Sequence, residues 1–273
     1  MSTYPSDLTE REWQVVAPLL PAPAQRGRPR TVSLRRILNG IFYCIRTGCA
    51  WRYVPPTYGP WSTLYDYFRR WRKEERWRQI QARLREQVRQ KAGRKPTPTA
   101  AIIDSQSAKT TEQGGPHGYD GGKKINGRKR HLLVDTMGLV LRVVVHPANI
   151  PDRQGSQLLL NGIRAQFPDL AHIWADQGYT GTAKVWAREH EQIDLEVVYP
   201  WWRHLKRYLP EVLEARGLTG FQVLPRRWVV ERTFAWLGRF RRLSKDYERL
   251  PETSETVISL ASIRSLLRRL AVS

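Results

Sequence analysis

The first 95 residues place apolar side chains at the three- and four-residue intervals that are typical of amphipathic helices. Thr9 and Glu12 have the spacing of an N-terminal capping box and precede one such segment. Ser33 precedes a second segment, and Gly48 follows the last apolar residue of that segment. We therefore expect one helix after Thr9 and another between Ser33 and Gly48.

A third helical pattern begins after Ser62 and continues past Trp77, with basic residues along its polar side. Consecutive helices of which the second is basic resemble a DNA-binding helix-turn-helix, although the connection here is longer than the usual tight turn. Residues 1–97 hold 20 of the 46 Lys and Arg residues but only 7 of the 25 Asp and Glu residues. We therefore expect residues 1–95 to form a helical, helix-turn-helix-like DNA-binding domain.

The pattern changes after residues 93–98, a Gly/Lys/Pro segment that we expect to separate two domains. Apolar runs typical of strands follow at 100–104, 130–134, 139–145, 171–176 and 195–199, and helical patterns separate the later ones. Residues 135–138 have the composition of a hairpin turn. A hairpin followed by helical crossovers predicts a mixed sheet with helices on both faces. This element order is that of a ribonuclease-H-like α/β fold, which we expect in residues 96–273.

A later helical pattern, over residues 226–242, places Glu231 among arginines and opposite a broad apolar arc. The simplest interpretation is an exposed ion pair between Arg227 and Glu231, four residues apart on one helix. Two aspartates change this picture, because Asp104 ends the first apolar strand and Asp176 ends the fourth. Sites in open sheets form beyond the carboxyl ends of strands, and the first and fourth strands are neighbours in this fold. We therefore expect Asp104, Asp176 and Glu231 to lie close together.

Three clustered carboxylates raise one another's pKa unless a divalent cation neutralises them. Mg²⁺ prefers oxygen ligands, and two such ions can activate a water or a 3′-hydroxyl for attack on a phosphodiester. Asp104 and Asp176 could each instead be a turn residue. Asp135, in the hairpin turn, and Asp152, at a helix start, are rival carboxylates that we rank lower. The histidines show no ligand spacing, and we expect His131 to be structural or to face DNA.

Charge and composition point to a polyanionic partner. The net charge is +21 and the pI is about 10.6, which predicts binding to nucleic acid. We expect the following basic residues to contact DNA: Arg28, Arg30, Arg69, Arg70, Arg72, Lys73, Lys123, Lys124, Arg128, Lys129, Arg130, Arg227, Arg239 and Arg242.

The two cysteines and the chain start exclude several other classes of protein. Cys44 and Cys49 lack the second pair of Cys or His residues that a zinc site needs, so we expect reduced thiols. No signal peptide is recognisable at the start, and no segment approaches the roughly 18 apolar residues of a membrane span. We therefore expect a cytoplasmic protein that does not bind a membrane.

Four segments resemble the motif blocks of bacterial insertion-sequence transposases of the DDE type, in the insertion-sequence-five family (IS4/IS5-like). They are Ile-Asp-Ser-Gln-Ser at 103–107, the Gly- and Lys-rich segment 121–131, Ala-Asp-Gln-Gly-Tyr at 175–179, and Arg-Trp-Val-Val-Glu-Arg-Thr-Phe at 227–234. Residues 48–63 resemble the N-terminal region of the same family, so the resemblance covers essentially the whole chain. Two positions differ from a related group: Leu224 replaces a Tyr, and Gly238 replaces a Lys, with Arg239 next to it as a candidate phosphate contact.

The resemblance implies a catalytic triad of Asp104, Asp176 and Glu231 that binds two Mg²⁺ ions, or Mn²⁺. It implies cleavage and strand transfer at the terminal inverted repeats of an insertion sequence, with a homodimer bound to double-stranded terminal and target DNA near the nucleoid. The alternatives are a related nuclease that does not join strands and a DNA-binding protein without catalysis. The three intact carboxylates favour an active enzyme over the second alternative.

Overall fold

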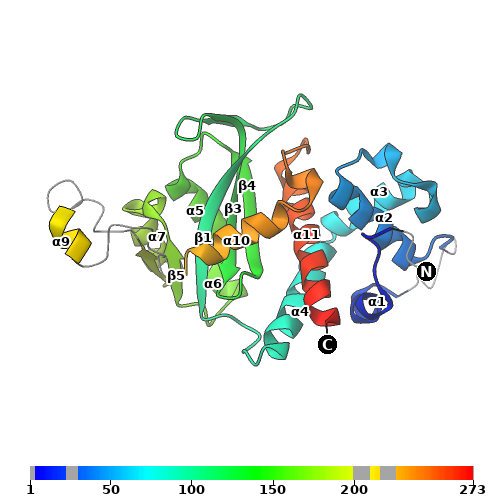
Figure 1. Cartoon of the computed structure of the whole chain (residues 1–273), viewed down its shortest axis with the longest axis horizontal. Helices are drawn as coiled ribbons and strands as arrows, with labels where there is room; N and C mark the ends of the chain where they lie inside the picture. The colour runs from blue at the N-terminus through cyan, green and yellow to red at the C-terminus, as the bar shows by residue number, and fades with distance from the viewer. Residues whose placement is uncertain (1–3, 23–29, 199–209, 216–225, 273) are drawn as a thin grey trace.

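A computed structural model describes residues 4–22, 30–198, 210–215 and 226–272 of the chain (Figure 1). Helix α1, Glu10–Val16, begins after Thr9, and the predicted capping box with Glu12 is present. Helix α2, Leu34–Thr47, begins after Ser33, whose side chain accepts a hydrogen bond from the N–H of Arg36. It ends at Gly48, which has a φ of 76°. The predicted starts of both helices and the predicted end of α2 are therefore confirmed.

The expectation of one long third helix capped by Ser62 is wrong. The segment forms two helices, α3, Trp61–Lys73, and α4, Arg76–Lys91, and no side chain caps the start of α3. The chain turns at Glu75, whose φ is 56°. The turn brings Trp71 and Trp77 together, with ring centroids 4.8 Å apart, so both indoles are buried. Aromatic packing across the turn thus overrides the continuous helical pattern.

The predicted mixed sheet is confirmed. Its strands are β1, Ala100–Lys109; β2, Gly118–Asp120; β3, Ile125–Asp135; β4, Val140–Pro147; β5, His172–Ala175; and β6, Asp194–Val197. The order is β2-β3-β1-β5-β6, and β4 also pairs with β3. Strand β1 is antiparallel to β3 and parallel to β5, so the first and fourth predicted strands are neighbours. The predicted hairpin turn joins β3 to β4, with the Gly138 N–H donating to the Asp135 carbonyl at 2.9 Å.

Strand β1 is longer than its apolar run, and this corrects one expectation. It continues past Asp104 to Lys109 because β3 pairs with it along that whole length. Asp104 therefore lies within a strand and not at its end. The parallel pairing with β5 covers only residues 100–102 of β1. Asp104 consequently lies just beyond the part of β1 that pairs with β5, near the C-terminal end of β5.

Helices cover both faces of the sheet. Helices α5, Asp152–Leu160, α6, Ile163–Gln166, and α7, Thr182–Glu191, pack on one face, with Ala101 and Ile103 of β1. Helices α10, Trp228–Leu237, and α11, Pro251–Ala271, pack on the other, with Ile102. Figure 1 shows α10 crossing β1, and α9, Pro210–Ala215, set apart beyond α7. Successive residues of β1 thus point to opposite helical layers.

The N-terminal helices α1 to α4, called the front helices below, share one hydrophobic core with the sheet. Residues of α2, α3 and α4 belong to the same buried cluster as α11 and the α10 face of the sheet. Figure 1 shows α11 lying between the front helices and the sheet. Two buried ion pairs add to this contact: Arg264 of α11 with Glu12 of α1, and Arg89 of α4 with Asp135 of β3. The segment at 93–98 therefore does not divide the core.

This shared core predicts that residues 1–95 do not fold alone, although they include every front helix. A fragment without α11 exposes the buried surfaces of α1, α2 and α4 and leaves Glu12 and Arg89 without their buried partners. We expect a broad, non-cooperative thermal transition by circular dichroism, against a cooperative one for the whole chain. A sharp transition of the fragment near the melting temperature of the whole chain would support an independent domain.

Within the described part of the chain, no helix has the length and apolar character needed to cross a lipid bilayer. Cys44 and Cys49 are free thiols, as expected.

Candidate active site

The register of β1 and β5 places Asp104 beside Asp176. Ile102 of β1 is opposite Trp174 of β5, and each aspartate lies two residues further along its chain. Residues two apart in extended chains point to the same face of a sheet, which here is the face covered by α10. Two carboxylates from segments 72 positions apart therefore meet beyond the carboxyl end of β5.

The environment of Asp104 disfavours its charged form. Its pKa is raised to about 6, mainly by burial and in smaller part by the negative charge of Asp176. The backbone N–H of Ser105, which donates to Asp104 Oδ1 at 2.7 Å, and the positive charges of Arg227 and Lys123 act in the opposite direction. A desolvated carboxylate next to a second carboxylate is a group that an added cation would stabilise.

Helix α10 brings Glu231 toward this pair. The guanidinium of Arg226 lies over the ring of Trp174, 4.4 Å from its centroid, which places the start of α10 above β5. Arg227 Nη2 is 3.8 Å from Asp176 Oδ2 and 3.7 Å from Glu231 Oε1. Arg227 therefore links two of the predicted site carboxylates. The ion pair between Arg227 and Glu231 that the helix spacing allows is also present.

Glu231 does not join the two aspartates as a third ligand in this conformation. Its side chain is 59% exposed and faces Arg227. Within the described residues, no three Asp, Glu, His or Cys side chains converge closely enough to hold a metal ion. Asp104 and Asp176 supply adjacent oxygen donors, which suit Mg²⁺.

The turn interactions that were alternatives for the two aspartates are also present. Asp104 accepts the N–H of Ser105 at 2.7 Å, and Asp176 accepts the N–H of Gly178 at 2.8 Å. Asp176 thereby caps the short 3₁₀ helix η4, Gln177–Tyr179. Each bond fixes one carboxylate oxygen, so these contacts position the aspartates in addition to shaping the turns.

The two rival carboxylates have different surroundings. Asp135 is buried against Arg89 and accepts hydrogen bonds from the N–H groups of the hairpin turn, so its role is structural. Asp152, in the first turn of α5, lies at the site, because a Cβ added at Gly178 would be 3.0 Å from Asp176 Oδ1 and 3.1 Å from Asp152 Oδ2. The low rank assigned to Asp152 in the sequence analysis did not anticipate this proximity. Its helix-start position carried no signal that α5 begins next to η4.

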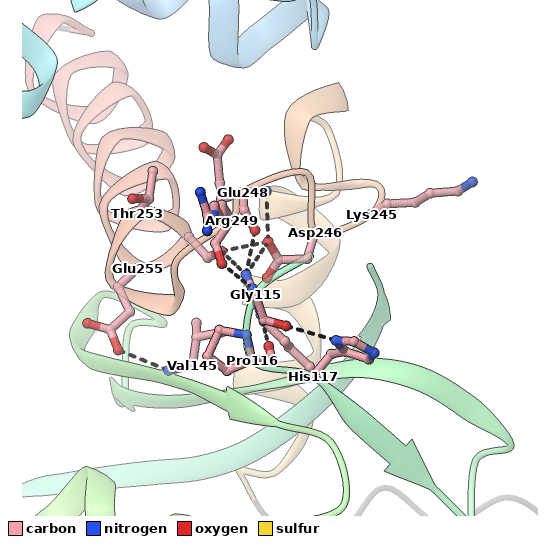
Figure 2. Close-up of polar contacts among 12 residues, drawn as sticks. Gly115, Pro116, His117, Val145, Lys245, Asp246, Glu248, Arg249, Thr253 and Glu255 are labelled. Carbon is pink, nitrogen blue, oxygen red and sulfur yellow. Dashed lines mark hydrogen bonds and ion pairs between the residues drawn. The ribbon is translucent and has the colours of Figure 1, made fainter. Parts of the chain in front are cut away.

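Four of the basic residues expected at DNA are buried, and their expected role is corrected. Arg128 donates hydrogen bonds to the carbonyls of Pro116, Glu248 and Arg249 and pairs with Asp246 at 3.2 Å. Figure 2 shows the three segments that meet there: residues 115–117, residues 245–249 and the start of α11. Arg128 thus joins them from the interior of the protein.

The other three buried residues also have internal partners. Arg130 donates to the carbonyls of Leu243 and Lys245, and Lys129 donates to the carbonyl of Ile150 at 3.0 Å. Arg242 pairs with Glu248 at 2.7 Å. The basic run at 128–130 looked exposed in the sequence, but helices or loops cover β3 on both faces there.

The remaining basic residues differ in exposure. Arg72 and Arg227 are half-buried, and Arg28 lies outside the described residues. The exposed ones are Arg30, Arg69, Arg70, Lys73, Lys123, Lys124 and Arg239. Leu224, one of the two departures from the related motif, also lies outside the described residues.

His131 is structural, one of the two roles expected for it. Its ring is buried and stacks on that of His146, with centroids 4.8 Å apart. Nδ1 lies 3.1 Å from the hydroxyl of Tyr179. Burial is the main reason that the pKa of His131 is far below its usual value.

Comparisons with known proteins identify the family of the chain. Residues 95–266 match the family described as "Transposase DDE domain", and residues 8–81 match "Putative transposase of IS4/5 family". A protein of Burkholderia cepacia, "Putative transposase for insertion sequence element IS402", is 31% identical over 134 residues. That alignment covers 45% of this chain and 54% of the relative, so the chain spans about half of the relative's length. The chain belongs to the DDE transposases of the IS4/IS5 family, as its motif blocks predicted.

Proposed function

We propose that this protein is a DNA transposase that binds the ends of its insertion sequence and catalyses Mg²⁺-dependent cleavage and strand transfer. The observation that carries this proposal is the parallel register that sets Asp104 beside Asp176, with Arg227 linking Asp176 to Glu231. Family membership supports the same reaction class.

The sheet supports a ribonuclease-H-like core for this chemistry. Strand β1 lies between the antiparallel β3, which also pairs with β4, and the parallel β5 and β6. The parallel crossovers run through helices on one face, while α10 brings Glu231 to the other. This order, which we infer to be ribonuclease-H-like, directs segments that are distant in sequence toward the end of β5.

The carboxylates of Asp104 and Asp176 are the residues that would hold Mg²⁺ or Mn²⁺, and Glu231 would join them once released by Arg227. Two bound ions would supply activation of a water or 3′-hydroxyl and stabilisation of the leaving oxygen. Arg227 then has two roles of its own. It offsets the negative charge of Asp176 and Glu231 in the free protein, and it is a cation near the DNA phosphates during the reaction.

Five of the exposed basic residues form two groups suited to the DNA backbone. Arg69, Arg70 and Lys73 lie on α3, and Lys123 and Lys124 lie in the turn between β2 and β3. Exposed cations that face solvent bind phosphates without reading sequence. We propose that these groups hold element-end and target DNA, with two copies of the chain in the complex. The helix-turn-helix assignment of α2 and α3 belongs to this proposal.

A strand-joining assay tests the proposal and separates the alternatives. The substrate is a duplex that ends in the inverted repeat flanking the reading frame, incubated with the whole chain, Mg²⁺ and a target plasmid. We expect nicked ends and covalent joining to the plasmid, and neither product from a duplex with a scrambled terminal sequence. Cleavage without joined products would favour a nuclease. Binding without cleavage would favour a DNA-binding protein that lacks catalysis.

A further inference from the structure

We infer that Asp152 is a positioning residue of the active site, which holds Asp104 in place through Ser105 from the opposite face of the sheet. The inference rests on the proposed function, because it concerns the geometry of a proposed metal-binding carboxylate. Nothing in the motif blocks assigns Asp152 a role.

Ser105 is the link between the two carboxylates. Its hydroxyl donates to Asp152 Oδ1 at 3.0 Å, and its backbone N–H donates to Asp104 Oδ1 at 2.7 Å. Successive strand residues alternate in direction, so Asp104 points toward α10 and Ser105 toward α5. The hydroxyl bond fixes the peptide of Ser105, and that peptide orients one oxygen of Asp104.

Asp152 is itself firmly held. Its Oδ1 is 3.2 Å from Nζ of Lys129, a buried side chain that also donates to the carbonyl of Ile150 at 3.0 Å. The Asp152 side chain is 25% exposed, so most of it is covered by the protein. A charged acceptor with a buried cation as partner is a stable anchor for a serine hydroxyl.

The buried ring of His131 provides a second observation that involves Asp152. His131 is buried, and none of the described residues gives its Nε2 a hydrogen-bond partner. That atom lies 3.6 Å from Asp152 Oδ1, while Nδ1 is 3.1 Å from the Tyr179 hydroxyl. A buried polar atom without a partner is costly, and here it faces the carboxylate at the wall of the site.

Glycines set the position of Asp152 against its neighbours. A Cβ at Gly155 of α5 would lie 2.4 Å from His131 Nε2 and 2.7 Å from His146 Nε2, so α5 approaches the histidines because no side chain intervenes. Gly178 is close to both Asp152 and Asp176, since a Cβ there would lie 3.1 Å from Asp152 Oδ2 and 3.0 Å from Asp176 Oδ1. Asp152 therefore contacts the segments that carry both aspartates.

A double-mutant cycle tests this link in the whole chain, with the variants Ser105→Ala, Asp152→Ala and the combination. Ser105→Ala keeps the backbone N–H to Asp104 and removes only the hydroxyl. We measure the cleavage rate at saturating DNA and, independently of activity, the Mn²⁺ affinity from the metal-induced rise in melting temperature. Each single variant should lower both by about 10–100-fold, the usual effect of losing a partner that orients a ligand. The double variant should lose no more than the larger single loss, because both break one link.

Asp169→Ala is the matched control, since Asp169 is an exposed aspartate just before the N-terminal end of β5, whereas Asp176 follows its C-terminal end. It should leave both measurements unchanged. Wild-type behaviour of Ser105→Ala, or additive losses in the double variant, would overturn the inference even if Asp152→Ala is unstable. If the wild type does not cleave DNA, the proposed function fails, whereas the Mn²⁺ arm still decides the inference. A wild type without Mn²⁺ binding overturns both.

Discussion

Replacing Asp104 or Asp176 by Asn, or Glu231 by Gln, is expected to abolish metal-dependent DNA cleavage while DNA binding is retained. Metal ligands supply several kcal/mol of transition-state stabilisation, so each loss should lower the rate by at least about 10³-fold. The measurement is single-turnover cleavage of end DNA, with binding followed by fluorescence anisotropy. Glu252→Gln, on the first turn of α11, is a control that should cleave normally.

The melting temperature provides a second measurement of the role of Glu231. Because Arg227 faces Glu231 on an exposed helix face, Glu231→Gln should change the stability measured without added metal by at most about 1 kcal/mol. The rise in melting temperature that Mg²⁺ or Mn²⁺ confers should be smaller in this variant than in the wild type. Equal rises in the two proteins would show that Glu231 is not a ligand, and retained cleavage by any one variant would remove that residue from the triad.

Arg128→Ala is expected to lower the free energy of unfolding by about 3–5 kcal/mol, because it leaves Asp246 buried without its cation. Three carbonyls, of Pro116, Glu248 and Arg249, also lose a donor. Urea unfolding of the purified variant measures the change.

Two control variants test whether the loss of stability in Arg128→Ala comes from an unpaired buried charge. Lys123→Ala removes an exposed positive charge and should alter stability by no more than about 0.5 kcal/mol. Arg128→Met combined with Asp246→Leu should recover part of the loss, since no buried charge remains. A loss in Arg128→Ala as small as that of Lys123→Ala would mean that Arg128 does not hold these segments together.

Local signals predicted the parts of the fold that local interactions determine. The caps of α1 and α2 and the hairpin turn depend on residues within a few positions of one another. The length of β1 and the break at Glu75 do not, because distant strand pairing and the packing of Trp71 on Trp77 decide them. The family was identified by the resemblance of the motif blocks to those of known transposases.

The candidate site could likewise be predicted only in part. Asp104 and Asp176 could be paired from the strand order alone, since parallel neighbours bring their ends together. The roles of Arg128 and Asp152 depend on which helix covers which face of β3 and β1. A basic run reads the same in sequence whether its side chains face solvent or carbonyls of the interior.

The position of α11 has a consequence for how the chain folds during synthesis. The core of the front helices includes residues from α11, which follows the whole sheet in the sequence. The front helices therefore leave the ribosome long before α11 has been synthesised. Their apolar surfaces remain exposed to solvent while the strands of the sheet are synthesised. Contacts of such large sequence separation slow folding and prolong the exposure of aggregation-prone surface. We therefore expect the protein to complete its core only after α11 has emerged.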